Sequence, residues 1–328
     1  MKKMIIFGFI FLTAFIVVSN PLTNEYISKV KMSSVMVMKQ GDSLYNEIAM
    51  KADQYNIPAI DAKIDPIWKT LPGYNGQMVD VDASYIKMKK TGQFNESMLI
   101  FKQVKPNIHL EDLPPAPIYK GNPEKPMVSF IINVAWGNEY LSDMLATLKQ
   151  HHVSVTFFLE GRWAQKYPEL AQMITDAGHE VGNHSFTHPN MKNQSTGQIQ
   201  EEITKTNGVI KATTGSNPKW FAPPSGSFKD EVVKIASNEG MGTIMWSVDT
   251  IDWQKPSPDV LIQRVMSKVH NGAIILMHPT AATSQSLEQL IIQIKNKKLQ
   301  INTVSNLLSE DRILHTLPQR SNDNNPSH

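Results

Sequence analysis

From Met127 to about residue 308 the chain alternates short apolar runs with amphipathic stretches, and this alternation constrains the fold most. The apolar runs have the length of strands, and the stretches between them carry apolar residues at helical spacing. Repeated strand–helix units imply parallel strands that are joined by right-handed crossovers. We therefore expect an α/β domain whose sheet is closed, or nearly closed, into a distorted (β/α) barrel. A doubly wound open sheet is the alternative.

Local signals place the elements within this region. Gly178 is the expected C-cap of a helix, Ser195 and Gln198 form a capping box, and Pro258 suits the first position of a helix. The expected strands are 128–132, 153–159, 179–183, 220–222, 243–248 and 273–277. The expected helices are 141–149, 168–176, 195–211, 230–238, 258–269 and 286–295.

The rest of the chain divides into shorter segments. Residues 30–110 suggest a small mixed α+β domain, with strands at 35–38, 78–82 and 100–104 and a helix at 44–55. Prolines crowd residues 111–126 and predict a stiff, extended linker to the barrel, which spans 127–308. The polar, asparagine-rich segment 313–328 is expected to be disordered.

The N-terminus predicts export from the cytoplasm. Lys2 and Lys3 precede about fifteen apolar residues, which fits a signal peptide within residues 1–26. A spanning helix needs roughly 20 residues, and no clear cleavage site follows, so an uncleaved membrane anchor is equally compatible. The chain has no cysteine and a net charge of only +2, with no basic block interleaved with aromatic residues. Cysteine chemistry is therefore excluded, and nucleic acid is not an expected partner.

Chemically capable side chains follow the expected strands at their carboxyl ends. His184 and His188 follow the third strand, Asp249 and Trp253 the fifth, and His278 the sixth. In an α/β barrel this end carries the chemistry, and neutral imidazoles suit zinc and similar metals. Two histidines alone could be ordinary polar loop residues. The whole set favours a functional site.

The same motifs, in this order, resemble the polysaccharide deacetylase family, also called the NodB homology domain, over residues 127–308. The pattern HSxxH is intact from His184 to His188, DxxDW from Asp249 to Trp253, and LxH from Leu276 to His278. The chain is also similar to a sporulation-associated branch of this family. The resemblance implies a metal-dependent N-deacetylase that acts on acetylated glycans such as peptidoglycan or chitin-like N-acetylglucosamine polymers.

The resemblance also implies roles for single residues. His184 and His188 would bind a divalent metal, often zinc, and His278 would be the general acid. Asp249 would orient and tune that acid. The acetyl pocket would be formed by four further residues, namely Trp253, Leu276, Pro223 and Pro224.

Two motifs depart from the family pattern. The family's first motif is TFDDG, whose two aspartates are the general base and the third metal ligand; here Asn133 and Val134 stand at these positions. Ala222 replaces the arginine of the third motif, which orients the base. A positioned general base contributes roughly 10²–10⁴ in rate. We therefore expect weak or no catalysis, and a metal that is weakly bound or absent.

Three functions remain open at this point. The first is an impaired deacetylase that binds cell-wall glycan through the retained pocket. The second is a working deacetylase that recruits a substitute base or ligand, for which Asp252 and Glu139 are candidates. The third is a structural protein of the envelope.

Overall fold

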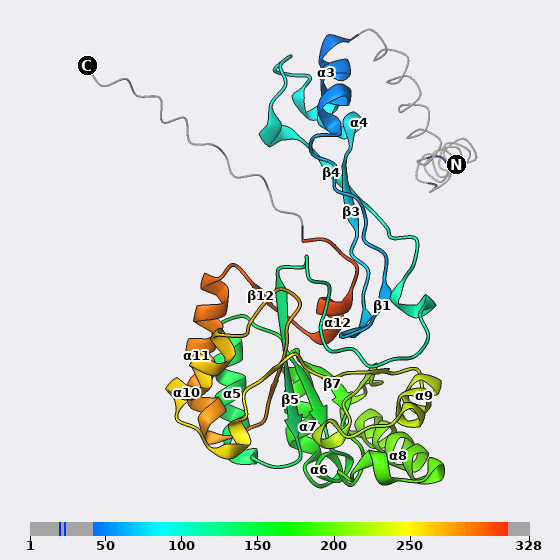
Figure 1. Cartoon of the computed structure of the whole chain (residues 1–328). Coiled ribbons are helices and arrows are strands. Elements are labelled where there is room, and N and C mark those ends of the chain that lie inside the picture. The colour runs from blue at the N-terminus through cyan, green and yellow to red at the C-terminus, as the bar shows by residue number, and fades with distance from the viewer. Residues whose placement is uncertain (1–19, 21–22, 24–41, 314–328) are drawn as a thin grey trace, which may run out of the picture. The chain divides into compact units, whose positions relative to one another are not determined.

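The computed structural model describes residues 20, 23 and 42–313 (Figure 1). The strand expected at 35–38 lies outside these residues, as do all but single residues of the leader at 1–26 and the tail at 313–328. Within the described part of the chain, no helix is both long and apolar enough to cross a bilayer. The described residues form two compact units. The larger contains Pro58–Gly76 and the chain from Gln103 onward; the smaller contains Gln77–Lys102 and the residues up to Ile57.

The smaller unit is a mixed α+β element with its own apolar core around Ile48 and Met88. Its elements are α3 (Ser43–Ala52), β3 (Gly76–Val79), α4 (Val81–Met88), η1 (Glu96–Met98) and β4 (Phe101–Val104). The strand expected at 78–82 is wrong beyond Val79. Asp80 accepts a hydrogen bond from the backbone N–H of Ala83 and caps α4, because an aspartate in extended backbone favours helix initiation over strand continuation.

The larger unit carries the alternating pattern. It begins with the hairpin strands β1 (Lys63–Asp65) and β2 (Lys69–Leu71) and the short helix η2 (Leu110–Asp112). The strands that follow are β5 (Met127–Val134), β6 (Thr156–Leu159), β7 (Glu180–Asn183), β8 (Trp220–Phe221), β9 (Gly242–Thr243), β10 (Val248–Asp249), β11 (Ile274–Met277) and β12 (Gln300–Ile301). The helices are α5 (Asn138–Gln150), α6 (Gly161–Lys166), α7 (Pro168–Asp176), η3 (Met191–Asn193), α8 (Thr196–Thr214), η4 (Pro224–Gly226), α9 (Asp230–Asn238), η5 (Asp252–Gln254), α10 (Pro258–Met266), α11 (Ala281–Asn296) and α12 (Val304–Leu308).

Seven strands form one curled parallel sheet in the order β10-β11-β5-β6-β7-β8-β9, and β12 pairs in addition with the start of β5. In register, Ile131 of β5 lies opposite Thr156 of β6 and Leu276 of β11. The expected α/β barrel is confirmed as a curled, half-barrel sheet, and the doubly wound alternative is not observed. Helices cover its outer face (Figure 1).

The two faces of the sheet carry separate cores, because successive side chains of a strand point to opposite sides. Phe130, Ile132 and Val134 of β5 pack against the covering helices. Ile131 of the same strand packs on the inner face, together with Leu276 of β11. This alternation decides which residues at the strand ends reach the site.

The strand expected at 243–248 is two strands on opposite edges of the sheet. β9 pairs with β8 and β10 pairs with β11, so only residues 244–247 separate the two edges. The linker enters this gap: the N–H of Ile118 donates to the carbonyl of Thr243, and the carbonyl of Ile118 accepts from Met245. Beyond it, Lys120 forms a bridge with Ala273. The proline-rich segment is therefore part of the larger unit's hydrogen-bonding network.

The sequence also missed or misplaced some helices. α6 was not expected, and α11 begins five residues earlier than predicted because the Thr280 side chain accepts the N–H of Thr283 as its N-cap. α12 was likewise not expected. The buried ammonium group of Lys125 caps the C-terminal end of α12, because it donates hydrogen bonds to the carbonyls of Asn306 and Ser309, each at 2.6 Å.

Candidate functional site

A cavity of about 460 Å³ opens at the carboxyl ends of the parallel strands. The strand-end residues Asn133, His184, Asp249 and His278 all lie on the inner face of the sheet and reach it, as the two-residue alternation requires. The complete lining is Asn133, Ala135, Trp136, His184, His188, Ser225, Trp246, Asp249, Trp253, Leu276 and His278. The structure thus brings together most of the site residues that the sequence predicted.

Four of the residues that the sequence assigned to the site do not line this cavity, namely Pro223, Pro224, Ala222 and Val134. Pro223 and Pro224 were expected in the substrate pocket, but the next residue, Ser225, lines the cavity instead. Pro224 is buried within η4, and Ser225 has a left-handed backbone with φ of 53°. Ala222, at the position of the family's arginine, is fully buried in the inner core.

The His184 ring is fixed by the backbone of the neighbouring strand end. Its Nδ1 lies 2.7 Å from the carbonyl oxygen of Ala222. A carbonyl only accepts, so Nδ1 carries the proton and Nε2 presents a lone pair. Burial lowers the pKa of His184 to about 3, helped by the neighbouring His188. The imidazole is therefore neutral across the physiological pH range.

The loop that carries both histidines is held by two polar side chains. Glu202 of α8 accepts hydrogen bonds from the backbone N–H groups of Phe186 and Thr187, and Asn183 accepts from the N–H of Ser185. Ser185 and His188 adopt left-handed backbone conformations, with φ of 63° and 56°. Strained backbone that the surroundings enforce is typical of functional loops.

This geometry brings the two imidazoles together. The ring centroids of His184 and His188 are 5.0 Å apart. His188 is exposed at the cavity mouth, whereas His184 is 1% exposed. Burial also lowers the pKa of the His188 ring.

Strand β5 places Asn133 and Val134 very differently. Asn133 is only 5% exposed and lines the cavity, and its Oδ1 has no hydrogen-bond partner among the described residues. Val134 is fully buried and packs in the outer core beside Ile132. A buried acceptor without a partner costs about 1–3 kcal/mol, which is the kind of cost that a ligand can relieve.

The residues present do not fit a tightly held divalent metal. Zinc sites in proteins use three or four nitrogen, sulfur or carboxylate ligands, whereas the described part of the chain contains no cluster of three or more such side chains. The substitutes suggested by the sequence lie elsewhere. Glu139 lines a separate pocket beside α6, and Asp252 is fully buried beneath His278.

Asp252, not Asp249, is the partner of His278, so the sequence assignment of this pair is wrong. Asp252 Oδ1 lies 2.8 Å from Nδ1 of His278, and its Oδ2 accepts from the backbone N–H of His278 and from the hydroxyl of Thr283. Asp249 instead accepts the N–H of Ile251 at 2.8 Å and closes a turn. The left-handed conformation of Ile251, with φ of 52°, turns the next carboxylate beneath the histidine.

Three tryptophans surround the cavity, and the sequence predicted only Trp253. Trp136 stacks on His278, with ring centroids 5.9 Å apart and planes inclined by 10°. Trp253 and Trp136 are 57% and 48% exposed, so both offer aromatic faces to a ligand. Trp246 completes the set from the segment between β9 and β10. The only sign of Trp136 in the sequence was its position, just after the end of β5 and three residues beyond Asn133.

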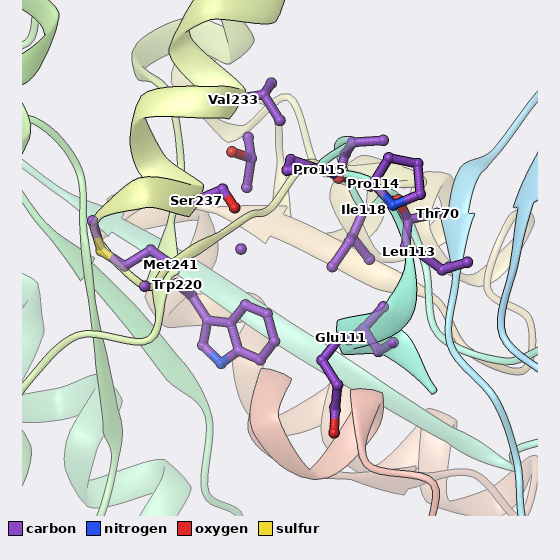
Figure 2. Close-up of a pocket in the computed structure, with 15 residues that line it drawn as sticks. Thr70, Glu111, Leu113, Pro114, Pro115, Ile118, Trp220, Val233, Ser237 and Met241 are labelled. Carbon is purple, nitrogen blue, oxygen red and sulfur yellow. Dashed lines mark hydrogen bonds between the residues drawn. The ribbon is translucent and has the colours of Figure 1, made fainter. Parts of the chain in front are cut away.

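A second cavity, of about 330 Å³, lies at the other end of the strands (Figure 2). Trp220 and Gly242, the first residues of β8 and β9, line it together with the linker residues Pro114 and Pro115. Thr243 also lines it, and the buried hydroxyl of this residue has no hydrogen-bond partner among the described residues. Its walls are mainly apolar, and Glu111 is their single ionisable side chain, so the first cavity is the candidate for chemistry.

Comparison with known proteins is consistent with this site. The family model described as polysaccharide deacetylase matches residues 120–244. The uncharacterized protein YlxY of Bacillus subtilis is 53% identical over 309 residues, which are 94% of this chain and 97% of that protein. The peptidoglycan-N-acetylglucosamine deacetylase of Bacillus cereus is 31% identical over 179 residues, which are 53% of this chain and 65% of that protein.

Solved structures give a sharper comparison. The crystal structure of a CE4 family pseudoenzyme from Bacillus anthracis is 56% identical, covers 83% of this chain and 97% of its own, and superposes with a TM-score of 0.79. A mutant of the same pseudoenzyme with restored enzymatic activity matches at 55% identity, covers 83% of this chain and 100% of its own, and also has a TM-score of 0.79.

Proposed function

Because the chain belongs to the polysaccharide deacetylase family, also called CE4, we propose that it binds acetylated cell-wall glycan in the strand-end cavity and has little or no deacetylase activity. Peptidoglycan is the proposed glycan, since several relatives are named peptidoglycan deacetylases. The protein would then act outside the cytoplasm. Export, or anchoring through the N-terminal segment, is part of the same proposal.

The observation that carries the proposal is the side chain of Asn133 in the cavity. An amide at this position cannot take a proton from water near neutral pH, and the cavity offers only one carboxylate, Asp249, which closes its own turn. The proposed general acid, His278, by contrast keeps a partner that fixes its ring, because its Nδ1 is hydrogen-bonded to Asp252. The likeness to a pseudoenzyme supports the same conclusion.

The retained aromatic lining supports binding rather than a purely structural role. A structural protein gains nothing from exposing two tryptophans around a polar cavity, whereas sugar rings pack well on aromatic faces. Trp136 and Trp253 are therefore the proposed sugar contacts, and the neutral His184 faces the group attached to the ring.

Calorimetry on the full chain with N-acetylglucosamine oligomers and peptidoglycan fragments tests the proposal, alongside an acetate-release assay with and without zinc. We expect measurable binding and no acetate. Trp253→Ala should weaken binding about tenfold, equivalent to about 1.4 kcal/mol. Trp68→Ala, which removes a tryptophan that does not line the cavity, is the matched control. Efficient acetate release would favour a working deacetylase, and failure of all glycans to bind would favour the structural role.

A further inference from the structure

The lining of the cavity includes three residues that carry hydrogen-bond acceptors. Nε2 of His184 presents a lone pair, because Nδ1 donates to the carbonyl of Ala222. Oδ1 of Asn133 is buried and has no partner among the described residues. The carboxylate of Asp249 lines the same space. A ligand that satisfies these groups must bring several donors.

The charge of the lining selects the same kind of ligand. Of the eleven lining residues one is an aspartate, and none is a lysine or arginine. The ring of His278 is paired with the buried carboxylate of Asp252. Negative charge that is not balanced within the lining attracts a cation. A divalent metal is a poor candidate because it needs three or four ligands, and the described residues contain no cluster of three or more side chains that could hold one.

We propose that the cavity binds the ammonium group of a de-N-acetylated amino sugar, so that the protein recognises glycan from which acetyl groups have already been removed. The inference rests on the proposed glycan-binding function and names the form of glycan that is preferred. An ammonium group brings three N–H donors and a positive charge. They match Nε2 of His184 and the carboxylate of Asp249, which both belong to lining residues, and a turn of the Asn133 amide would add its buried Oδ1. An acetamido group brings one N–H donor, no charge and an acceptor of its own.

The surrounding residues place the sugar for this contact. Trp136 and Trp253 offer exposed faces beside the acceptors, so a sugar ring stacked there directs a ring substituent inward. Asn133 also differs from an aspartate in a useful way. A neutral amide accepts from the ammonium group, but it does not remove a proton from water, so recognition is separated from hydrolysis.

The test compares tetramers of N-acetylglucosamine and of glucosamine, titrated into the full chain at about pH 6, where amines are protonated. Calorimetry is run with a chelator and again with zinc. We expect the glucosamine tetramer to bind at least tenfold more tightly, without zinc, and the preference to shrink at high salt. Asn133→Leu should abolish the preference, because the glucosamine tetramer should lose more affinity than the acetylated tetramer does. Asp249→Asn should reduce the preference several-fold, and it covers the case in which Asn133→Leu fails to fold.

The outcomes separate the two proposals. Equal affinity, or tighter binding of the acetylated tetramer, overturns the preference for ammonium and leaves glycan binding in place. A preference that survives in both variants places the ammonium contact elsewhere and also overturns the inference. Failure of both tetramers and of peptidoglycan fragments to bind removes the proposed function itself.

Discussion

At the scale of single residues, Asp252 has more consequences than any other carboxylate of the site. It is fully buried, and it accepts from the backbone and ring of His278 and from the hydroxyl of Thr283, at 2.6 to 2.8 Å. A buried carboxylate tolerates such a position only when several donors surround it. The structure therefore gives Asp252 a positioning role, and it makes the orientation of His278 depend on a residue that does not touch the cavity.

Replacing Asp252 should therefore cost far more than replacing Asp249. We expect Asp252→Asn to lower the free energy of unfolding by about 2–3 kcal/mol, because an amide cannot accept from all three donors at once. Asp249→Asn keeps an oxygen for the N–H of Ile251 and should cost less than about 1 kcal/mol. Urea unfolding of both variants measures the difference, and equal losses would contradict it. The ring N–H signal of His278 in NMR spectra should move strongly only in Asp252→Asn.

The site was predictable from the sequence where simple alternation governs it. Asn133, His184, Asp249 and His278 each occupy the inward position at a strand end, and all four line the cavity. The partner of His278 was not predictable in this way. That choice depends on the left-handed turn at Ile251, which a β-branched residue rarely adopts and which its own sequence does not signal.

At the scale of elements, strand β5 separates the two degenerate positions of the first motif. Asn133 faces the cavity, and Val134 faces the apolar core that the helices cover. A carboxylate introduced at position 133 would have polar neighbours, whereas one introduced at position 134 would be surrounded by apolar side chains. The two substitutions should therefore differ in their effect on the fold as well as in their effect on chemistry.

We expect Asn133→Asp to leave the melting temperature nearly unchanged and Val134→Asp to lower it clearly, because an unpaired buried carboxylate is costly. In the double variant, zinc should recover much of the loss if the new carboxylate turns toward His184 and His188. Deacetylase activity should then rise above that of the natural chain. Thermal melts with and without zinc, run beside an acetate assay, measure both effects. Val134→Asn, of similar size but uncharged, is the control, and a metal response in that variant would refute the explanation.

The order of strands and helices was largely predictable because apolar periodicity is strong in this part of the chain. The limits of α7 and α9 agree with the prediction to the residue. The split of 243–248 into β9 and β10 was not predictable, since six consecutive strand-like residues give no sign that the sheet ends between them. Only the curl of the whole sheet brings its two edges within reach of one short segment.

At the scale of the whole molecule, buried histidines make the stability depend on pH. Burial lowers the pKa of His179 to about 4 and that of His184 to about 3, from the usual 6.5. As the pH falls below about 6.5, the unfolded chain takes up these protons first, so stability that is present above this pH is lost on acidification. Each histidine contributes up to about 1.4 kcal/mol per pH unit in this window.

The free energy of unfolding should therefore fall steadily from about pH 6.5 to pH 4, as measured by urea titrations at each pH. His179→Gln should reduce the slope of the unfolding free energy against pH by the equivalent of about one bound proton. His109 provides the opposite case, because its hydrogen bond with Glu310 raises its pKa. The stability that His109 adds is fully present below about pH 6.5 and is lost as the pH rises above that value, so His109→Gln should lower the stability throughout the acid range without changing its slope there. A slope unchanged by His179→Gln would show that this ring is not the source.

The bridge from Ile118 to the two edges of the sheet has a practical consequence for dividing the chain into modules. The proline-rich segment would usually be chosen as a cutting point for domain exchange or for expression of the α/β unit alone. A fragment that starts at Met127 would lose the hydrogen bonds that Ile118 makes with Thr243 and Met245 and the bridge from Lys120 to Ala273. It would leave two unpaired edges and the inner core open to solvent, which favours aggregation. The portable unit of this protein therefore begins before the prolines, not after them.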